Sequence, residues 1–320
     1  MRVTVRVAEL SSSQKTRNVL SVDGFPLSCT NVPNAGLSLL RMQKNALNVE
    51  ECSLEKMTIF KECQALKEAD WRAWQREGYV RLGRIADLSV LQQLRSRIDA
   101  LMLGEVPTEG IYFQLDSDTG NYSDLKFSDG KWTIPTLAYR KIELLENDPL
   151  FRNYIQHPHF QSIAKRIIGE EVSIYRAMFM NKPAGKGTEL PYHQDAGLQW
   201  QLDRDPVMTV WTALDPATRD NGCIEVIPGS HKLGLLSEFG HTITPEQEER
   251  CSKMGSVILE AGMGEVILLH NLLLHRSGIN PTDTPRRAFS VCYMDAATRD
   301  ISGKGRLFPV VFSSQNESSH

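Results

Sequence analysis

The chain has 320 residues, of which 41% are hydrophobic, and its 36 lysines and arginines nearly balance 39 aspartates and glutamates. This length can bury a sizeable core in one catalytic domain. The charge pattern has no long basic block, so it indicates no nucleic-acid or membrane-surface partner, and no apolar run is long enough to cross a bilayer.

In chain order, residues 1–56 show no regular pattern, because glycine and proline interrupt every apolar run. We predict an N-terminal extension of uncertain order there. A catalytic domain is predicted over residues 57–312, followed by a C-terminal tail over residues 313–320.

Helical periodicity marks the front half of this domain. A helix is predicted from Asp70, and a short strand follows from Tyr79. Apolar residues spaced three and four apart predict an amphipathic helix over residues 88–103. A similar pattern predicts another helical stretch over about residues 149–168.

From Val172 the pattern changes to short β-rich runs separated by turn residues. The predicted strands are 172–180, 190–194, 207–214, 223–227, 256–259, 265–271 and 287–294. Many short strands at this spacing are typical of a double-stranded β-helix, which is the jelly-roll or cupin-like fold. The predicted fold class is mainly β with flanking helices, and the jelly-roll core spans about residues 172–295.

His193 and Asp195 stand two residues apart on one predicted strand. Side chains at positions i and i+2 of a strand point the same way, so these two can reach one metal ion while Gln194 faces away. His275, on a neighbouring strand, would complete a set of two nitrogens and one oxygen. A facial triad of this kind, with its opposite side open, is typical of non-haem Fe(II) oxygenases. A His-x-Asp tripeptide alone is a weak signal.

Other histidines compete with His275 for the third position. His270 lies five residues earlier and is an alternative, or a core residue. We prefer His275 because Arg-Ser-Gly follows it and a cationic residue lies eleven positions further on. His231 and His241 fall in loops and are expected at the surface.

That cationic residue is Arg286. Its permanent positive charge can hold a dicarboxylate co-substrate through a forked pair of hydrogen bonds. The adjacent Arg287 is an alternative for this role, because alternation along a strand cannot by itself choose between them.

Five motifs, taken in order, resemble the phytanoyl-CoA dioxygenase family. They are Tyr192-His193-Gln194-Asp195, Trp211-Thr212-Ala213-Leu214, Asn221-Gly222-Cys223, Ile227-Pro228-Gly229-Ser230-His231-Lys232 and His275-Arg276-Ser277-Gly278. Members of this family are Fe(II)- and 2-oxoglutarate-dependent oxygenases on the double-stranded β-helix. The likeness runs from about Asp70 to about Asp295.

The resemblance implies that His193, Asp195 and His275 are the catalytic iron ligands. It also implies contacts with 2-oxoglutarate from five positions, which are Lys141, Met178, Trp211, Ser277 and Arg286. The implied cofactors are therefore Fe(II) and the co-substrate 2-oxoglutarate.

The expected activity is hydroxylation of a small organic molecule or an acyl-CoA-type substrate, with dioxygen consumed and succinate and CO2 released. Two alternatives stay open. One is a catalytically silent metal- or metabolite-binding protein of the same fold. The other is a cupin-like enzyme that uses zinc or manganese at the same three ligands. The prime substrate and the oligomeric state are not predicted.

The cytoplasm is the predicted compartment. Residues 1 to about 24 lack the continuous apolar stretch of a secretory signal, and the last four residues differ from a peroxisomal address. Six cysteines without paired spacing are expected to be reduced thiols. They are Cys29, Cys52, Cys63, Cys223, Cys251 and Cys292.

Overall fold

The computed structural model describes residues 20–22, 25–27, 66–126, 129–237 and 241–314. The chain divides into two units, residues 1–60 and 61–320, and each is described by itself. In the first unit, β1 (Leu20–Val22) and β2 (Phe25–Leu27) form an antiparallel pair. The predicted domain start at residue 57 lies outside the described residues, as do Cys29, Cys52, Cys63 and the end of the predicted tail.

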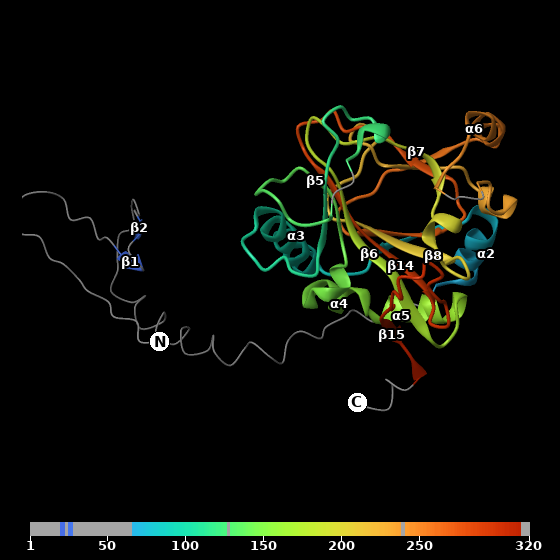
Figure 1. The fold of residues 1–320 in the computed structure, drawn as a ribbon, viewed down its shortest axis with the longest axis horizontal. Coiled ribbons are helices and arrows are strands. Elements are labelled where there is room, and N and C mark those ends of the chain that lie inside the picture. Colours follow the sequence, from blue (N-terminus) through green and yellow to red (C-terminus); the bar gives the residue numbers. More distant parts are fainter. Residues whose placement is uncertain (1–19, 23–24, 28–65, 127–128, 238–240, 315–320) are drawn as a thin grey trace, which may run out of the picture. The chain divides into compact units, whose positions relative to one another are not determined.

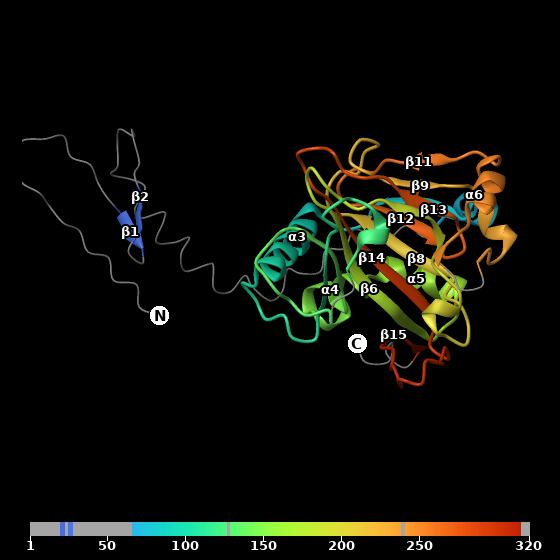
Figure 2. The same cartoon turned by 45° about the horizontal axis from the view of Figure 1, so that its top comes forward.

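The second unit is built on two antiparallel β-sheets, which lie one above the other in Figure 2. The larger sheet has eight strands, in the order β3-β12-β8-β14-β6-β5-β4 with β15 added to β6. Their bounds are β3 (Tyr79–Arg84), β4 (Tyr112–Leu115), β5 (Tyr139–Glu143), β6 (Val172–Lys182), β8 (Met208–Ala213), β12 (Glu265–His270), β14 (Arg286–Asp295) and β15 (Val310–Phe312).

The smaller sheet has five strands, in the order β10-β7-β13-β9-β11. Their bounds are β7 (Leu190–Gln194), β9 (Ile224–Val226), β10 (His241–Thr242), β11 (Val257–Leu259) and β13 (His275–Ser277). From β6 to β9, and again from β12 to β14, successive strands alternate between the two sheets. This alternation makes a double-stranded β-helix, so the predicted fold class is confirmed. The larger sheet reaches beyond residues 172–295, because β3, β4, β5 and β15 join it.

The helices of the front half cover the larger sheet. They are α2 (Glu68–Glu77), α3 (Leu88–Leu103), α4 (Pro149–Ile155) and α5 (Pro158–Ile167), and their buried side chains form one apolar cluster with β6, β8, β12 and β14 (Figure 1). Helix α6 (Pro245–Ser252) lies between β10 and β11 in the chain. Four short 3-10 helices complete the unit, η1 (Tyr122–Asp124), η2 (Leu145–Asn147), η3 (Leu198–Trp200) and η4 (Ser230–Leu233). No helix in the described part of the chain is long and apolar enough to cross a membrane.

The helical stretch predicted over residues 149–168 is wrong in one respect, because it is two helices. Pro158 has no N–H to donate, and its ring disfavours helical geometry at the residue before it. His157 accordingly has φ −56° and ψ 133°, so α4 ends just before it and Pro158 begins α5. By contrast, α3 has the predicted bounds, and its residues Leu91, Leu94 and Ile98 are fully buried.

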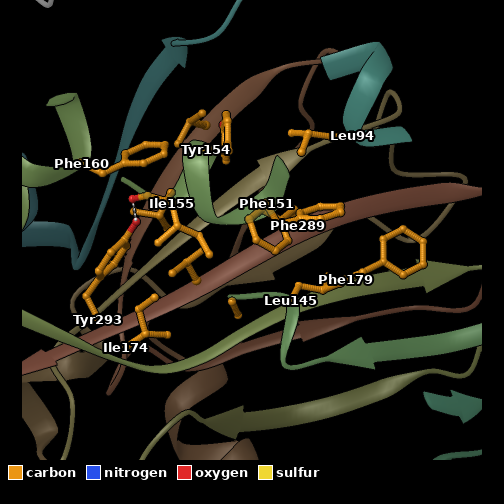
Figure 3. Packing of buried hydrophobic residues seen from close by; sticks show 14 of the residues in the cluster. Leu94, Leu145, Phe151, Tyr154, Ile155, Phe160, Ile174, Phe179, Phe289 and Tyr293 are labelled. Atoms are coloured by element: carbon orange, nitrogen blue, oxygen red, sulfur yellow. Dashed lines mark hydrogen bonds between the residues drawn. The ribbon is translucent and has the colours of Figure 1, made fainter. Parts of the chain in front are cut away.

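Aromatic side chains fill the space between these helices and the larger sheet (Figure 3). The ring of Phe151 lies 4.8 Å from that of Phe289, and the hydroxyl of Tyr293 donates a hydrogen bond to the carbonyl oxygen of Ile155 at 2.7 Å. Phe289, Val291 and Tyr293 all point into this core. Because side chains alternate along a strand, the even-numbered residues in the first half of β14 point to the opposite face.

Candidate metal centre and co-substrate cavity

A cavity that is open to solvent receives side chains from both sheets. All eight residues predicted for the site line it. They are His193, Asp195, His275, Arg286, Lys141, Met178, Trp211 and Ser277. Their strands are far apart in the chain, so the two sheets bring together what the sequence separates.

His193 and His275 face each other across neighbouring strands. They are register partners in the β7–β13 pair, and their ring centroids are 4.0 Å apart. Asp195 follows the last residue of β7, and its Oδ2 atom lies 3.8 Å from Nε2 of His275. Two imidazoles and one carboxylate therefore converge at one end of the cavity.

Hydrogen bonds to the backbone orient both rings. Nδ1 of His193 lies 2.8 Å from the carbonyl oxygen of Pro191, and Nδ1 of His275 lies 2.9 Å from that of Leu273. A carbonyl oxygen only accepts, so each Nδ1 carries the proton and each Nε2 keeps a free lone pair. Burial, aided by the neighbouring His275 and His241, lowers the pKa of His193 well below its ordinary value. The neutral form is the one that binds a metal ion.

Gln194 faces away from the cavity, as predicted, and its side chain anchors the chain after β9. Its Nε2 donates to the carbonyl oxygens of Gly234 and Leu272, and its Oε1 accepts from the N–H of Leu236. The backbone of Asp195 is held separately, because its N–H donates to the carbonyl oxygen of Asn271 at 2.8 Å. Hydrogen bonds of the Gln194 side chain and of the Asp195 backbone therefore hold the His193–Asp195 segment in place.

The expectation that His241 lies at the surface is wrong. It begins β10, which pairs with β7, and its ring centroid is 4.7 Å from that of His193. The donor atoms of His193, Asp195 and His241 all lie within 4.8 Å of one another, so His241 is a second candidate for the third ligand. Its Nε2 atom is 2.5 Å from the hydroxyl of Tyr122, which also lines the cavity.

His231 and His270 lie together beside Trp74 rather than in the cavity. The ring of His270 is 5.0 Å from that of His231 and 5.5 Å from that of Trp74. Nδ1 of His270 accepts the N–H of Leu272. The surface position expected for His231 is therefore also wrong, since it is partly buried in this packing.

Arg286 points into the cavity at the start of β14. Its side chain is 2% exposed, and its guanidinium carbon lies 6.0 Å from the ring centroid of Trp211. Burial lowers its pKa to about 10. Its Nε atom is buried and has no hydrogen-bond partner among the described residues. Such an unpaired donor is costly unless an acceptor arrives, and the distal carboxylate of 2-oxoglutarate fits that need.

Arg287 points to the opposite face of the same strand. Its Nε and Nη2 atoms donate to the two carboxylate oxygens of Asp215, at 2.6 and 3.0 Å, and its Nη1 donates to Asp99 at 2.6 Å. Its charge is thus fully paired outside the cavity. Of the two arginines, only Arg286 can meet a ligand there.

The other predicted co-substrate contacts surround Arg286 and the metal ligands. Lys141 forms an ion pair with Glu143 at 2.9 Å. Met178 and Trp211 are buried and supply apolar wall, and Ser277 ends β13 two residues after His275. The candidate metal ligands and the predicted co-substrate residues therefore line the same cavity.

The cavity residues that were missed from the sequence include Tyr122, Arg140, Arg176 and His241. For Arg176 a signal was available, because it shares strand parity with Met178. Its Nη2 lies 3.7 Å from Oδ1 of Asp195. The positions of Tyr122, Arg140 and His241 depend on a short 3-10 helix, a strand irregularity and a two-residue strand, respectively, and none of these leaves a periodic pattern.

Comparisons with known proteins agree with this geometry. The model of the phytanoyl-CoA dioxygenase (PhyH) family matches residues 74–288. A phytanoyl-CoA dioxygenase of Arabidopsis thaliana is 27% identical over 238 residues, which cover 67% of this chain and 84% of that protein. The human protein named "Phytanoyl-CoA dioxygenase, peroxisomal" is 23% identical, over 72% of this chain and 69% of its own length.

Solved structures share the fold. EctD from S. alaskensis, solved with 2-oxoglutarate and 5-hydroxyectoine, has a TM-score of 0.60 at 21% identity, and the match covers 75% of this chain and 82% of EctD. The epimerase SnoN, solved with Fe3+, alpha ketoglutarate and nogalamycin RO, also has a TM-score of 0.60, at 18% identity over 76% of this chain and 98% of SnoN. With the family model matching more than half of its residues, the chain belongs to the phytanoyl-CoA dioxygenase (PhyH) family.

Proposed function

We propose that this chain oxidises a small organic molecule by hydroxylation at the site where His193, Asp195 and His275 meet. As a PhyH-family protein, it is an Fe(II)- and 2-oxoglutarate-dependent dioxygenase, which uses dioxygen and releases succinate and CO2. The observation that carries the proposal is the convergence of these three side chains beside Arg286, a buried cation without an anionic partner among the described residues.

We assign the third iron ligand to His275 rather than His241. His275 holds its Nδ1 proton on a backbone carbonyl and keeps Nε2 free, 3.8 Å from Asp195. In contrast, Nε2 of His241 is already hydrogen-bonded to the hydroxyl of Tyr122. A ligand needs a free lone pair, and Nε2 of His275 has one beside Asp195, whereas Nε2 of His241 is occupied by Tyr122.

Iron and 2-oxoglutarate, when bound, supply the oxidising chemistry. The chain's own residues bind, orient and isolate them. Arg286 neutralises the distal carboxylate, and Lys141 and Ser277 donate hydrogen bonds to the co-substrate. Met178 and Trp211 exclude water from the reacting end of the cavity, which strengthens these charge interactions.

The proposal is tested with the full chain purified without oxygen and reconstituted with Fe(II). Succinate formation from 2-oxoglutarate, screened across acyl-CoA thioesters and small organic acids, alcohols and amines, identifies the molecule whose oxidation is coupled to turnover. Absence of 2-oxoglutarate binding would favour the silent metal-binding alternative. Activity with zinc or manganese in place of iron would favour the cupin-like alternative.

We also propose that the protein acts in the cytoplasm. The described cysteines Cys223, Cys251 and Cys292 are buried and free, as is usual in a reducing compartment. Microscopy of the tagged full chain in its own cells tests this proposal. Co-localisation with peroxisomes would overturn it and would match the compartment in the human relative's name.

A further inference from the structure

Arg140 lines the cavity and has no part in binding iron or 2-oxoglutarate as proposed above. We infer that the prime substrate carries a carboxylate group, and that Arg140 binds this group. The inference rests on the proposed function, and it names the substrate class of the same site.

The charges around the cavity single out Arg140. Five cationic side chains line the cavity, and three of them have a carboxylate partner among the described residues. These pairs are Lys141–Glu143 at 2.9 Å, Arg176–Asp195 at 3.7 Å and Arg276–Glu225 at 2.9 Å. Arg286 is assigned to 2-oxoglutarate. Only Arg140 is then left, within the described part of the chain, without a carboxylate in ion-pair distance.

The groups in direct contact with Arg140 are neutral, and the carboxylates of Asp116 and Glu143, which also attract it, lie beyond ion-pair distance. Nη1 of Arg140 donates to the amide oxygen of Gln114 at 3.2 Å, and its guanidinium carbon lies 5.7 Å from the ring centroid of Tyr122. The side chain is partly buried, and loss of water around it lowers its pKa. A guanidinium with five donors and one neutral acceptor retains most of its hydrogen-bonding capacity. Keeping such a charge away from water is unfavourable unless an anion compensates it.

An irregularity in β5 brings Arg140 to the cavity. In the β4–β5 pair, Leu115 is opposite Tyr139 and Gln114 is opposite Lys141, so Arg140 has no register partner. Tyr139 points into the apolar core and Lys141 into the cavity. Regular alternation would send Arg140 to the core side, whereas the bulge turns it to the same side as Lys141. Bulges next to active sites commonly redirect a side chain in this way.

A series of contacts through Tyr122 and His241 leads from Arg140 to His193. Arg140 lies over Tyr122, whose hydroxyl contacts His241, whose ring in turn lies 4.7 Å from that of His193. A substrate held at Arg140 by its carboxylate would extend past Tyr122 and His241 toward the iron. The group that is oxidised is therefore not the carboxylate but a carbon at the other end of the molecule.

One unpaired guanidinium matches one singly charged group. A carboxylate carries one negative charge and accepts the forked pair of hydrogen bonds that arginine offers. A phosphate monoester carries closer to two charges at neutral pH and would need a second free cation. A carboxylate is therefore the better match for this cavity.

The experiment compares acids with their amides. The full chain, loaded with Zn(II) and saturating 2-oxoglutarate, is titrated with acetate, hexanoate, benzoate and indole-3-acetate and with the four matching primary amides. Phenyl phosphate is included as a doubly charged probe. We expect at least one acid to bind about 10- to 100-fold tighter than its amide, as is usual for a hydrogen bond to a charged group. Arg140→Gln is expected to bring this ratio close to one, and Arg140→Lys to retain part of it.

Two readouts separate this role from a structural one. Arg140→Gln should leave the affinity for 2-oxoglutarate unchanged. It should also keep or raise the melting temperature, because it removes a charge without a partner. The matched control is Arg204→Gln, which changes an exposed arginine outside the cavity and should alter no probe affinity.

Equal binding of acids and amides by the wild type, or an acid preference that survives in Arg140→Gln, would overturn the inference. So would weaker binding of 2-oxoglutarate by Arg140→Gln, since Arg140 would then belong to the co-substrate. Tighter binding of phenyl phosphate than of every acid would overturn the choice of carboxylate. If the chain binds 2-oxoglutarate and forms succinate but shows no acid preference, only this inference is wrong. If it neither binds 2-oxoglutarate nor forms succinate, the proposed function is wrong.

Discussion

The two sheets that enclose the cavity differ in length, in support and in the side chains that they present. The smaller sheet has strands of two to five residues, and it carries His193 and His275. The larger sheet includes β6 with 11 residues and β14 with 10, and it presents Arg286, Lys141 and Met178. Its other face packs on helices, whereas the proposed metal ligands are oriented by local hydrogen bonds. Metal binding and co-substrate binding should therefore be separable by mutation.

The largest effect is expected from Asp195→Ala. It removes the one negatively charged donor of the proposed ligand set, so bound iron and succinate formation should both fall to background. Metal content after anaerobic reconstitution measures this directly. Asp118→Ala, which changes a carboxylate that is 84% exposed, should retain iron. An Asp195→Ala protein with a full complement of iron would show that the three residues are not the ligands.

Histidine variants sharpen the assignment on the smaller sheet. His275→Ala should lose iron, whereas His241→Ala should retain it, because Nε2 of His241 is bonded to Tyr122. Both proteins are examined by the same metal analysis and by circular dichroism to check folding. The reverse pattern, with iron lost only from His241→Ala, would transfer the ligand role to His241.

On the larger sheet, Arg286→Gln and Arg287→Gln should have opposite consequences. Loss of Arg286 should weaken 2-oxoglutarate binding by about 2–5 kcal/mol, because one partner of a buried charge pair is removed. Loss of Arg287 should instead lower the free energy of unfolding by about 3–5 kcal/mol, because Asp215 would remain buried without its partner. Calorimetric titration and denaturant unfolding measure the two quantities. Unchanged 2-oxoglutarate affinity in Arg286→Gln would contradict its role.

A smaller effect is expected from Gln194→Ala, which tests the local support of the metal site. Three backbone groups, on Gly234, Leu236 and Leu272, would lose their side-chain partner. The free energy of unfolding should fall by about 1–3 kcal/mol, and iron should bind more weakly. Gln201→Ala, at an exposed position, is the control. Unaltered stability and metal affinity would mean that the chain after β9 holds its place without Gln194.

The smallest effect is a change in pH dependence at His270, at the end of β12. Burial, with a contribution from His231, lowers its pKa to about 4, whereas an unfolded histidine titrates near 6.5. Between these values the unfolded chain binds a proton that the folded chain does not, so the free energy of unfolding falls as pH drops from about 6.5 to 4. His270→Asn should flatten part of this slope in denaturant titrations at several pH values. An identical slope would contradict the shift.

Local patterns explain why much of the fold could be predicted. The apolar periodicity that predicts α3 and the β-rich segment that predicts β7 each depend on residues close in the chain, and both elements have the predicted bounds. The single helix over residues 149–168 was wrong because the effect of Pro158 on its neighbour outweighed an unbroken apolar periodicity. Strands β4 and β5 were not predicted, since four or five residues of mixed polarity carry little periodic signal.

The sequence by itself determined the fold class, the family and which side chains were candidates for the site, because these depend on residue type, order and short-range spacing. Only the tertiary structure decided that Arg286 faces the cavity and Arg287 faces Asp215, that His241 lies beside His193, and that a bulge turns Arg140 inward. The physical reason is strand register. Which face a side chain occupies depends on pairing between segments far apart in the chain, and no local pattern encodes that pairing.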